Sequence, residues 1–494
     1  MRINKKNICI YIGLFIIVFA LALSSTYNPF NLRRMHVDSS VYITIAKGIT
    51  RGQLPYRDFV DNKGPLTYII SVPGLLLGGF TGVWITEIVL LFVSVLFAYK
   101  IALFFGNHFQ AFLGTLFSFV LLIVFFYVNA GTEEYSFPFL MISLYIFTKY
   151  YFSEKHEVTV FELIVLGSCF ASAVLIKPNM FPLWAGFCFV ILLENLFKQR
   201  YFLLLKYFLF FCTGIFVIFI PVFFYLQTNG IFLLFINQVI LGGAAKGFNI
   251  KNFNEIVKNY FIIINRNYSF LPLFFGVFCL LKYYKQSLFI FYAGYVFSYF
   301  LMVLFLSFTT GDSHCNMVLI PFFIPVLSYL INFLYSSFYS IKRKEILLVL
   351  FLCFIFSERL IRYFNSFSYI FFDISGANLI KAGKTIDENT LPEDKIISLG
   401  FNGYIYPFTQ RQTASKYFYQ GSGLDYVISS IKPSDGFIAD ILTAKPKIIA
   451  IFIAEGRIGQ IIENWHTPIL ELIKTEYRLL SDANGFLFYI RDID

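Results

Sequence analysis

Long apolar runs, separated by short polar loops, occupy most of the first 364 residues. A helix needs about 20 apolar residues to cross a bilayer, so this pattern predicts a polytopic α-helical membrane protein with about eleven spans. The shorter apolar stretch 66–80 contains Pro73 and several glycines, and we expect an interfacial or re-entrant helix there. The predicted spans are 8–27, 83–105, 110–128, 135–152, 161–176, 181–197, 205–226, 270–284, 287–308, 317–340 and 345–361.

The pattern changes near residue 365. Helix-like segments there alternate with β-type runs at 395–399 and 447–453 and a β-rich segment at 477–490. This alternation predicts a small α/β domain. We therefore expect two domains.

The expected domains are a transmembrane catalytic domain, 1–364, and a C-terminal α/β domain, 365–494. The first includes two long external loops, 28–82 and 227–269. The second loop carries basic residues among aromatic and aliphatic ones, which suits a helix on the membrane surface or a connecting loop with a solvated basic face.

Sidedness follows from the short loops, because Lys and Arg mark the cytoplasmic side. Alternate short loops are basic, as is the N-terminus, whereas the loops between them hold acids and a single Lys. We therefore predict a multi-pass cell-membrane protein with a cytoplasmic N-terminus and an extracytoplasmic C-terminal domain. A cleaved signal peptide ending near Ala22 is the alternative for the first span, but the downstream charges fit a retained one.

Composition agrees with the membrane class. The chain is 58% hydrophobic and 14% charged, against about 25% charged in soluble domains. Of the net charge of +10, residues from 365 onward contribute −3 and the membrane part +13. That basic excess suits anionic headgroups and a phosphorylated lipid, and no nucleic-acid-binding pattern is present. Seven cysteines without a CxxC motif imply neither a disulfide framework nor a zinc site.

Candidate chemistry begins in the first external loop. Asp38 follows the first span closely, and Tyr42 follows it at helical spacing. A carboxylate at the membrane surface can deprotonate an acceptor hydroxyl, although Asp before a helical run is also a common N-cap. Arg57 and Lys63 lie among Pro and Gly residues near Asp61, where they can meet an anion or simply form an exposed turn.

The loop's sequence carries a resemblance. The patterns Asp-Ser-x-x-Tyr, Gly-x-Leu-Pro-Tyr-Arg-Asp-Phe and Asp-Asn-Lys-Gly-Pro-Leu resemble the first-loop signature of bacterial GT-C glycosyltransferases. These are family 39-like relatives of the protein O-mannosyltransferases and the lipid A aminoarabinose transferase. The resemblance implies a multi-span enzyme that uses polyprenyl- or dolichyl-phosphate-linked monosaccharides, with Asp38 as the catalytic Asp. Ser39 stands where many members carry a second acid, which weakens any inference of a metal at this loop.

Weaker similarities extend the resemblance along the chain. It implies catalytic roles for Glu133 and Glu134, and substrate or phosphate binding by Lys177, His314 and Arg411. Each residue also has a structural explanation. The acids suit a helix start, Lys177 can snorkel to the interface, and the other two can be solvated polar residues.

These expectations combine into one mechanism. Because no ATP is available outside the membrane, the donor must carry the energy, as a sugar–phosphate ester on a polyprenol does. Asp38 would act as general base in one inverting displacement, and Arg57, Lys63, Lys177 and His314 would stabilise the leaving phosphate. The expected partners are the lipid-linked donor, membrane lipids and a glycan, lipid or protein acceptor. No cofactor or metal ligand set is predicted, and a divalent cation is left open.

Two other function classes compete with this interpretation. A flippase for lipid-linked sugars would place ionisable residues in the middle of its spans, which are nearly free of them here. A sensor or scaffold would not need the charged first loop. A cavity shared by Asp38, Glu133, Lys177 and His314 would favour the transferase. The sequence specifies neither the sugar, the acceptor, the polyprenol nor the oligomeric state.

Overall fold

The computed structural model divides the chain into two compact units. The helical unit comprises Met1–Ser25, Ile85–Val222 and Gly247–Tyr369, and the mixed unit comprises Thr26–Trp84, Phe223–Lys246 and Ile370–Asp494. Most of the first external loop therefore groups with the C-terminal residues. The structure describes residues 5–30, 37–121, 131–154, 157–243, 253–308, 313–337, 341, 343–361, 364–365, 375–399, 403–419, 433–453 and 467–492.

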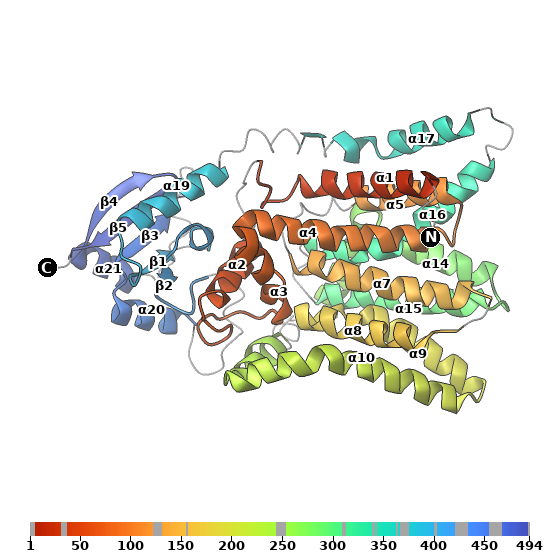
Figure 1. Cartoon of the computed structure of the whole chain (residues 1–494), viewed down its shortest axis with the longest axis horizontal. Helices are drawn as coiled ribbons and strands as arrows, with labels where there is room; N and C mark the ends of the chain where they lie inside the picture. The colour runs from red at the N-terminus through yellow and green to blue at the C-terminus, as the bar shows by residue number, and fades with distance from the viewer. Residues whose placement is uncertain are drawn as a thin grey trace. The chain divides into compact units, whose positions relative to one another are not determined.

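The helical unit is a bundle whose helices run roughly along one direction (Figure 1). Helix α15 packs against α9 and α14, α16 packs against α5, and α7 packs against α8. A helix occupies each of the eleven apolar runs that the sequence assigned to spans. The elements that lie wholly in this unit are α1 (Lys5–Ala22), α5 (His108–Val120), α7 (Thr132–Phe152), α8 (Val160–Ile176), η1 (Pro178–Met180), α9 (Pro182–Phe197), α13 (Phe253–Asn265), η3 (Arg266–Tyr268), α14 (Leu271–Lys282), α15 (Leu288–Ser307), η4 (Ser313–Leu319), α16 (Ile320–Ser337) and α17 (Lys344–Ile355).

Within the described residues, four helical stretches are both long and apolar enough to cross a membrane: Val72–Ala102, Tyr201–Thr228, Leu288–Ser307 and Cys315–Ser337. Other apolar helices in the bundle are shorter. The chain is thus mostly helical with membrane-spanning segments, and the number of eleven crossings remains a prediction.

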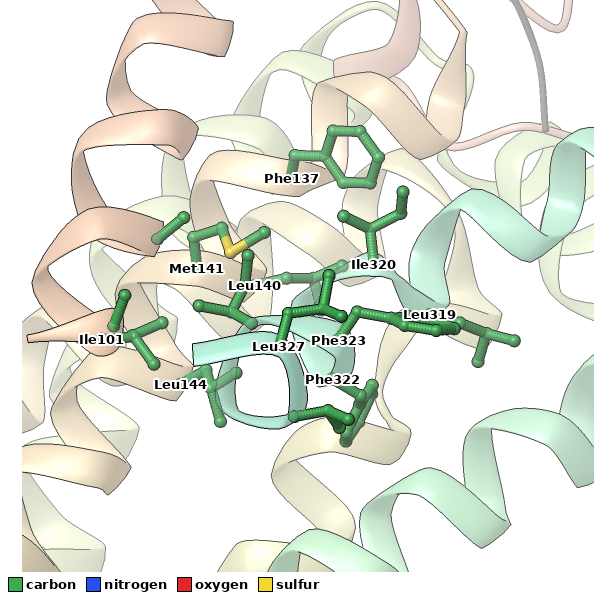
Figure 2. Close-up of a cluster of buried hydrophobic side chains, with 14 of the residues drawn as sticks. Ile101, Phe137, Leu140, Met141, Leu144, Leu319, Ile320, Phe322, Phe323 and Leu327 are labelled. Carbon is green, nitrogen blue, oxygen red and sulfur yellow. The ribbon is translucent and has the colours of Figure 1, made fainter. Parts of the chain in front are cut away.

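The core of the helical unit is built from apolar side chains of different helices. Figure 2 shows side chains from four elements that meet in one cluster: Ile101 from α4, Phe137, Leu140, Met141 and Leu144 from α7, Leu319 from the end of η4, and Ile320, Phe322, Phe323 and Leu327 from the start of α16. Phe137, Leu144 and Phe323 have no exposed surface at all. Because burying one such side chain contributes about 1.5–3 kcal/mol, this cluster holds the N-terminal half of α7 firmly in place.

Helix α4 (Val72–Ala102) is broken near its start. Gly78 and Gly79 depart from helical geometry. Gly79 has φ +58° and ψ −135°, a backbone conformation that residues other than glycine rarely adopt. The break isolates the segment before Gly78 from the long apolar part of α4. This geometry is compatible with the prediction that 66–80 does not cross the membrane by itself.

The mixed unit contains a five-stranded sheet of order β2-β1-β3-β5-β4. Strand β1 pairs in parallel with β2 and β3, while β5 pairs antiparallel with β3 and β4. The predicted β-runs are present, and the short β2 lies in a segment for which no strand was predicted. The strands are β1 (Lys395–Leu399), β2 (Gln412–Thr413), β3 (Ile448–Phe452), β4 (Tyr477–Ala483) and β5 (Phe486–Arg491).

The first-loop residues pack against tail residues within the mixed unit. The Val60 amide donates a 2.9 Å hydrogen bond to the Lys416 carbonyl, and the rings of Phe59 and Phe418 lie 5.5 Å apart. These contacts hold the first loop beside the segment that follows β2. The remaining elements of the unit are α2 (Val37–Ile49), α3 (Leu66–Ile69), α11 (Phe232–Phe235), a π-helical turn η2 (Ile236–Leu241), α19 (Ser375–Glu388), η5 (Tyr406–Phe408), α20 (Pro433–Ala444) and α21 (Thr467–Glu476), and α10 (Tyr201–Thr228) contributes its last residues.

Candidate active site

Helix α2 presents Asp38 in its first turn, as the second helical residue. The Ser40 hydroxyl donates a 2.6 Å hydrogen bond to the Val37 carbonyl in the same turn. The partial positive charge of a helix N-terminus favours a carboxylate at this place. Asp38 is half-buried, so the helix holds an ionisable group at a protected but reachable position.

Asp61 is the second acid of this site, and several groups fix it. The Tyr68 hydroxyl donates to Oδ2 of Asp61 at 2.6 Å, and the Asn62 amide donates to Oδ1 at 2.7 Å. The backbone amide of Asp61 donates to Oε1 of Gln238 at 3.3 Å, while Nε2 of Gln238 donates to the Tyr56 carbonyl at 2.7 Å. Tyr68 and the Asn62 amide therefore orient the carboxylate, while Gln238 holds the backbone of Asp61 near that of Tyr56.

Burial raises the pKa of Asp61 above its ordinary value, and the nearby charge of Asp38 raises it further. Lys63 and the hydrogen bonds from Tyr68 and the Asn62 amide oppose that rise. The two carboxylates thus lie within electrostatic range of each other. A pair of interacting acids at a half-buried position is a common arrangement for proton transfer and for binding hydroxyl groups.

Aromatic side chains surround the two acids. The Tyr68 ring lies 6.3 Å from those of Tyr42 and Tyr56. Tyr419 comes from the tail, and the pKa of its hydroxyl is raised by burial and then by the charges of Asp38 and Asp61. Tyr419 therefore lies within electrostatic range of both acids. Flat aromatic faces next to carboxylates form a surface that suits a sugar ring.

The two predicted cations of the first loop differ in their surroundings. Nζ of Lys63 donates to Oδ1 of Asn62 at 2.8 Å, and the charge of Lys63 acts on Asp61. Arg57 instead has 53% of its side chain exposed and pairs with its neighbour Asp58 at 2.8 Å. Lys63 is thus part of the acid cluster, whereas Arg57 is on the surface of the unit.

Arg411 has a different set of contacts. Its Nε donates to Oγ1 of Thr390 at 2.7 Å, and its Nη2 donates to the carbonyls of Asp387 and Thr390 at 3.0 and 2.7 Å. These groups follow or end α19, so Arg411 caps the C-terminal end of that helix. It also lines a pocket with Lys47 and Arg51.

Two further predicted residues meet in the helical unit. Nζ of Lys177, at the end of α8, donates to Oε1 of Glu133 at 2.5 Å. The Thr132 hydroxyl donates to Oε2 of Glu133 at 2.8 Å, and Sγ of Cys315 lies 3.9 Å from the Lys177 ammonium. Glu133 and the adjacent Glu134 are buried. Glu133 and Lys177 therefore form a largely buried ion pair at the first turn of α7.

The predicted site residues thus form two groups. Asp38, Tyr42, Asp61 and Lys63 cluster in the mixed unit, and Glu133 with Lys177 in the helical unit. The backbone of His314 lies in the first turn of η4, as its second residue, and its side chain lies outside the described part of the chain. A cavity shared by both groups stays a prediction. Among the described residues, no three His, Cys, Asp or Glu side chains gather closely enough to hold a metal ion.

Sequence reasoning missed Tyr68, Tyr419 and Gln238. Tyr68 falls inside the apolar stretch 66–80, where a tyrosine is typical of a membrane interface. Gln238 lies 177 residues from Asp61 in the chain, and Tyr419 is one tyrosine among 33. The only usable signal was the position of Tyr68 three residues after Pro65, at the close of the first-loop motif.

Neither the family models nor the curated proteins give a match to this sequence. Solved structures do. The chain is similar to ArnT from Cupriavidus metallidurans in the apo state, with a TM-score of 0.57 and 12% identity over 98% of this chain and 97% of that one. It is also similar to the same protein bound to undecaprenyl phosphate, with a TM-score of 0.55 and 11% identity over 99% and 98% of the two chains.

An archaeal oligosaccharyltransferase, AglB from Archaeoglobus fulgidus in complex with an inhibitory peptide and a dolichol-phosphate, matches with a TM-score of 0.44 and 13% identity over 98% of this chain and 74% of that one. The near-complete two-way coverage by ArnT, the lipid A aminoarabinose transferase, extends through both units. The chain therefore has the fold of ArnT, which is the GT-C fold that its first-loop motif predicted.

Proposed function

We propose that this protein is a membrane glycosyltransferase that moves a monosaccharide from a polyprenyl-phosphate carrier to an extracytoplasmic acceptor. The observation that carries the proposal is the pair Asp38 and Asp61, held beside Lys63 and ringed by tyrosines. The fold likeness to ArnT, which has been crystallised with undecaprenyl phosphate, supports the choice of donor. The acceptor is a cell-wall polymer, a lipid or a protein.

In this proposal Asp38 removes the proton from the acceptor hydroxyl. The new bond forms at the anomeric carbon while the bond from that carbon to the phosphate oxygen breaks, and the carrier leaves as polyprenyl phosphate. One such displacement inverts the configuration at the anomeric carbon. Asp61 accepts hydrogen bonds from sugar hydroxyls, since Tyr68 and the Asn62 amide fix its direction. Tyr42 packs behind Tyr68 and keeps it in place.

Cations neutralise the charge that develops on the leaving phosphate. Lys63 is the candidate beside the two acids, and the phosphate-binding roles of Lys177 and His314 stay as the family resemblance implies them. Each contact of this kind contributes roughly 2.7–4 kcal/mol to lowering the barrier. Glu133 holds Lys177 with a 2.5 Å hydrogen bond, so its role is to position that ammonium. Glu134 lies next to Glu133 in the first turn of α7. Arg57 and Arg411 are assigned to binding outside the reaction centre.

The test uses the purified protein with a panel of polyprenyl-phosphate sugars and candidate acceptors. Release of polyprenyl phosphate, together with a product of inverted anomeric configuration by NMR, is expected for at least one combination. If instead the protein in vesicles moves an intact lipid-linked sugar between leaflets without releasing carrier phosphate, the protein is a transporter and the proposal fails.

A further inference from the structure

A second charged pocket lies in the mixed unit, at the C-terminal end of α2. Three basic side chains, Lys47, Arg51 and Arg411, contribute to its wall. The pocket has a volume of about 10 Å³, which is close to what one water-sized group occupies. The other lining residues are mostly polar and are Thr44, Gly48, Gln53, Phe59, Tyr406, Gln412 and Thr413.

Backbone carbonyls hold two of these cations at the pocket. Nζ of Lys47 donates to the carbonyls of Pro407 and Thr409 at 2.8 and 2.9 Å. Nη1 of Arg51 donates to the Gln410 carbonyl at 3.1 Å, and its Nη2 donates to the Gln410 side chain. Neutral carbonyls orient these cations without cancelling their charge, and a guanidinium with five N–H groups retains donors for another acceptor.

The balance of charge at the pocket is positive. Asp387 is the acid that acts on Lys47 and Arg51. Its carboxylate accepts hydrogen bonds from the Thr409 hydroxyl at 2.6 Å and the Gln410 amide at 2.9 Å, and lies 4.0 Å from Nε of Arg411. One carboxylate therefore faces three cations.

This pocket is distinct from the acid site. Lys47 follows Asp38 by nine residues in the same helix, which corresponds to roughly 13.5 Å of rise at 1.5 Å per residue. Nine residues at about 100° each also turn the side chain to the opposite side of the helix. The two groups cannot act on the same phosphate oxygen.

We propose that the pocket formed by Lys47, Arg51 and Arg411 is a binding site for a phosphate-class oxyanion, separate from the site of sugar transfer. The small volume admits one oxygen of the anion, and its other oxygens would contact Arg51, which is exposed at the rim. Arginine forks and lysine are the side chains that recognise such groups in proteins. The anion is the phosphate of a lipid headgroup or a free phosphate group.

The lowered pKa of Lys47 agrees with a cation whose charge is only partly compensated by nearby acids. Burial lowers its pKa from 10.5 to about 8, the charge of Arg51 lowers it as well, and Asp387 opposes the decrease. A bound anion would favour the protonated ammonium. Anion binding should therefore weaken as the pH rises above about 8, because the empty pocket then loses the Lys47 charge.

The first experiment measures binding of radiolabelled sulfate, whose charge is constant between pH 7 and 9.5, to the detergent-purified full chain by equilibrium dialysis. Arg51→Gln should weaken binding at pH 7 by at least about tenfold, which is the scale of one charge-assisted hydrogen bond. The matched control is Arg478→Gln, because Arg478 is an exposed arginine that pairs with Asp492. It lies on β4, at the opposite edge of the sheet from β2. Wild-type binding should also be weaker at pH 9.5 than at pH 7.

The second arm identifies the source of the anion. Photoactivatable phosphatidic acid is incorporated in nanodiscs with the full chain, and cross-linked peptides are mapped. Cross-links within 44–53 or 406–413 that disappear in Arg51→Gln indicate a lipid headgroup. Sulfate binding without these cross-links indicates a soluble phosphate. Equal sulfate binding by wild type and Arg51→Gln, or absence of both sulfate binding and cross-links in wild type, would overturn the proposal.

Discussion

The hydroxyl of Tyr68 donates a 2.6 Å hydrogen bond to the carboxylate of Asp61. Because the Tyr68 ring also lies 6.3 Å from the Tyr42 ring of α2, this one residue connects the Asp38 helix with the second acid. The hydrogen bond favours the charged form of Asp61 against the effect of burial. Tyr68 thus contributes to both the orientation and the charge of Asp61, together with the Asn62 amide and Lys63.

Tyr68→Phe should therefore raise the pKa of Asp61 further. If ionised Asp61 binds the substrate, the acidic limb of the kcat/KM profile moves to higher pH in this variant, because the carboxylate takes up its proton earlier as the pH falls. The control is Tyr56→Phe, which loses a hydrogen bond to the Lys63 carbonyl and leaves the one to Asp61. An acidic limb that stays in place in Tyr68→Phe would exclude this role.

The Glu133–Lys177 pair predicts a strong energetic coupling. Removing one partner leaves the other charge buried and uncompensated, so Glu133→Gln and Lys177→Met should each lower the free energy of unfolding by about 3–5 kcal/mol. The double variant should lose clearly less than the two single losses combined. Thermal unfolding in detergent measures the cycle. Additive losses would mean that the 2.5 Å contact contributes no coupling.

The break in α4 predicts that alanine substitution of its two adjacent glycines has different effects on stability. Neither has an atom within 4 Å of an added Cβ, but Gly79 has φ +58° and Gly78 has φ −163°. Gly79→Ala should therefore cost about 1–3 kcal/mol of stability, the usual scale of such backbone strain. Gly78→Ala, measured in the same melting assay, should stay within about 0.5 kcal/mol of wild type. Equal effects of the two substitutions would argue against a glycine requirement at the break.

Lys47 predicts a pH dependence of stability. The pKa of Lys47 is 10.5 in the unfolded chain and about 8 in the folded chain, so the folded chain releases this proton at lower pH. Stability rises with pH wherever the unfolded state binds more protons, so wild type should gain stability relative to Lys47→Met between pH 8 and 10.5. Melting temperatures of both proteins across this range provide the comparison. If the stability of wild type relative to Lys47→Met stays constant or falls with pH, the pKa of Lys47 is not lowered by burial in the folded chain.

Local pattern was sufficient for much of the fold. Apolar runs such as 288–307 became helices because their length and composition leave few alternatives, and β1 spans the predicted residues 395–399. The short β2 was missed because its two residues are ordered by parallel pairing with β1 and not by their own sequence. The break at Gly79 was only hinted at by the several glycines of the segment.

The site was predicted only in part, for a related reason. Asp38, Asp61 and Lys63 lie in one continuous motif, so their proximity could be expected from the chain alone. Tyr419 reaches the same acids through the folding of the mixed unit. Arg411 matched a motif, yet its guanidinium donates to carbonyls at the end of α19, a role that motif matching cannot reveal.

The most direct test of the proposed reaction is the turnover of Asp38→Asn with the donor and acceptor that wild type uses. Loss of a general base lowers the rate by about 10²–10⁴-fold, and the melting temperature should remain near that of wild type. Asp482→Asn, the same change at an exposed position of β4, should release polyprenyl phosphate at the wild-type rate. Normal release by Asp38→Asn would contradict the assignment of Asp38 as the base.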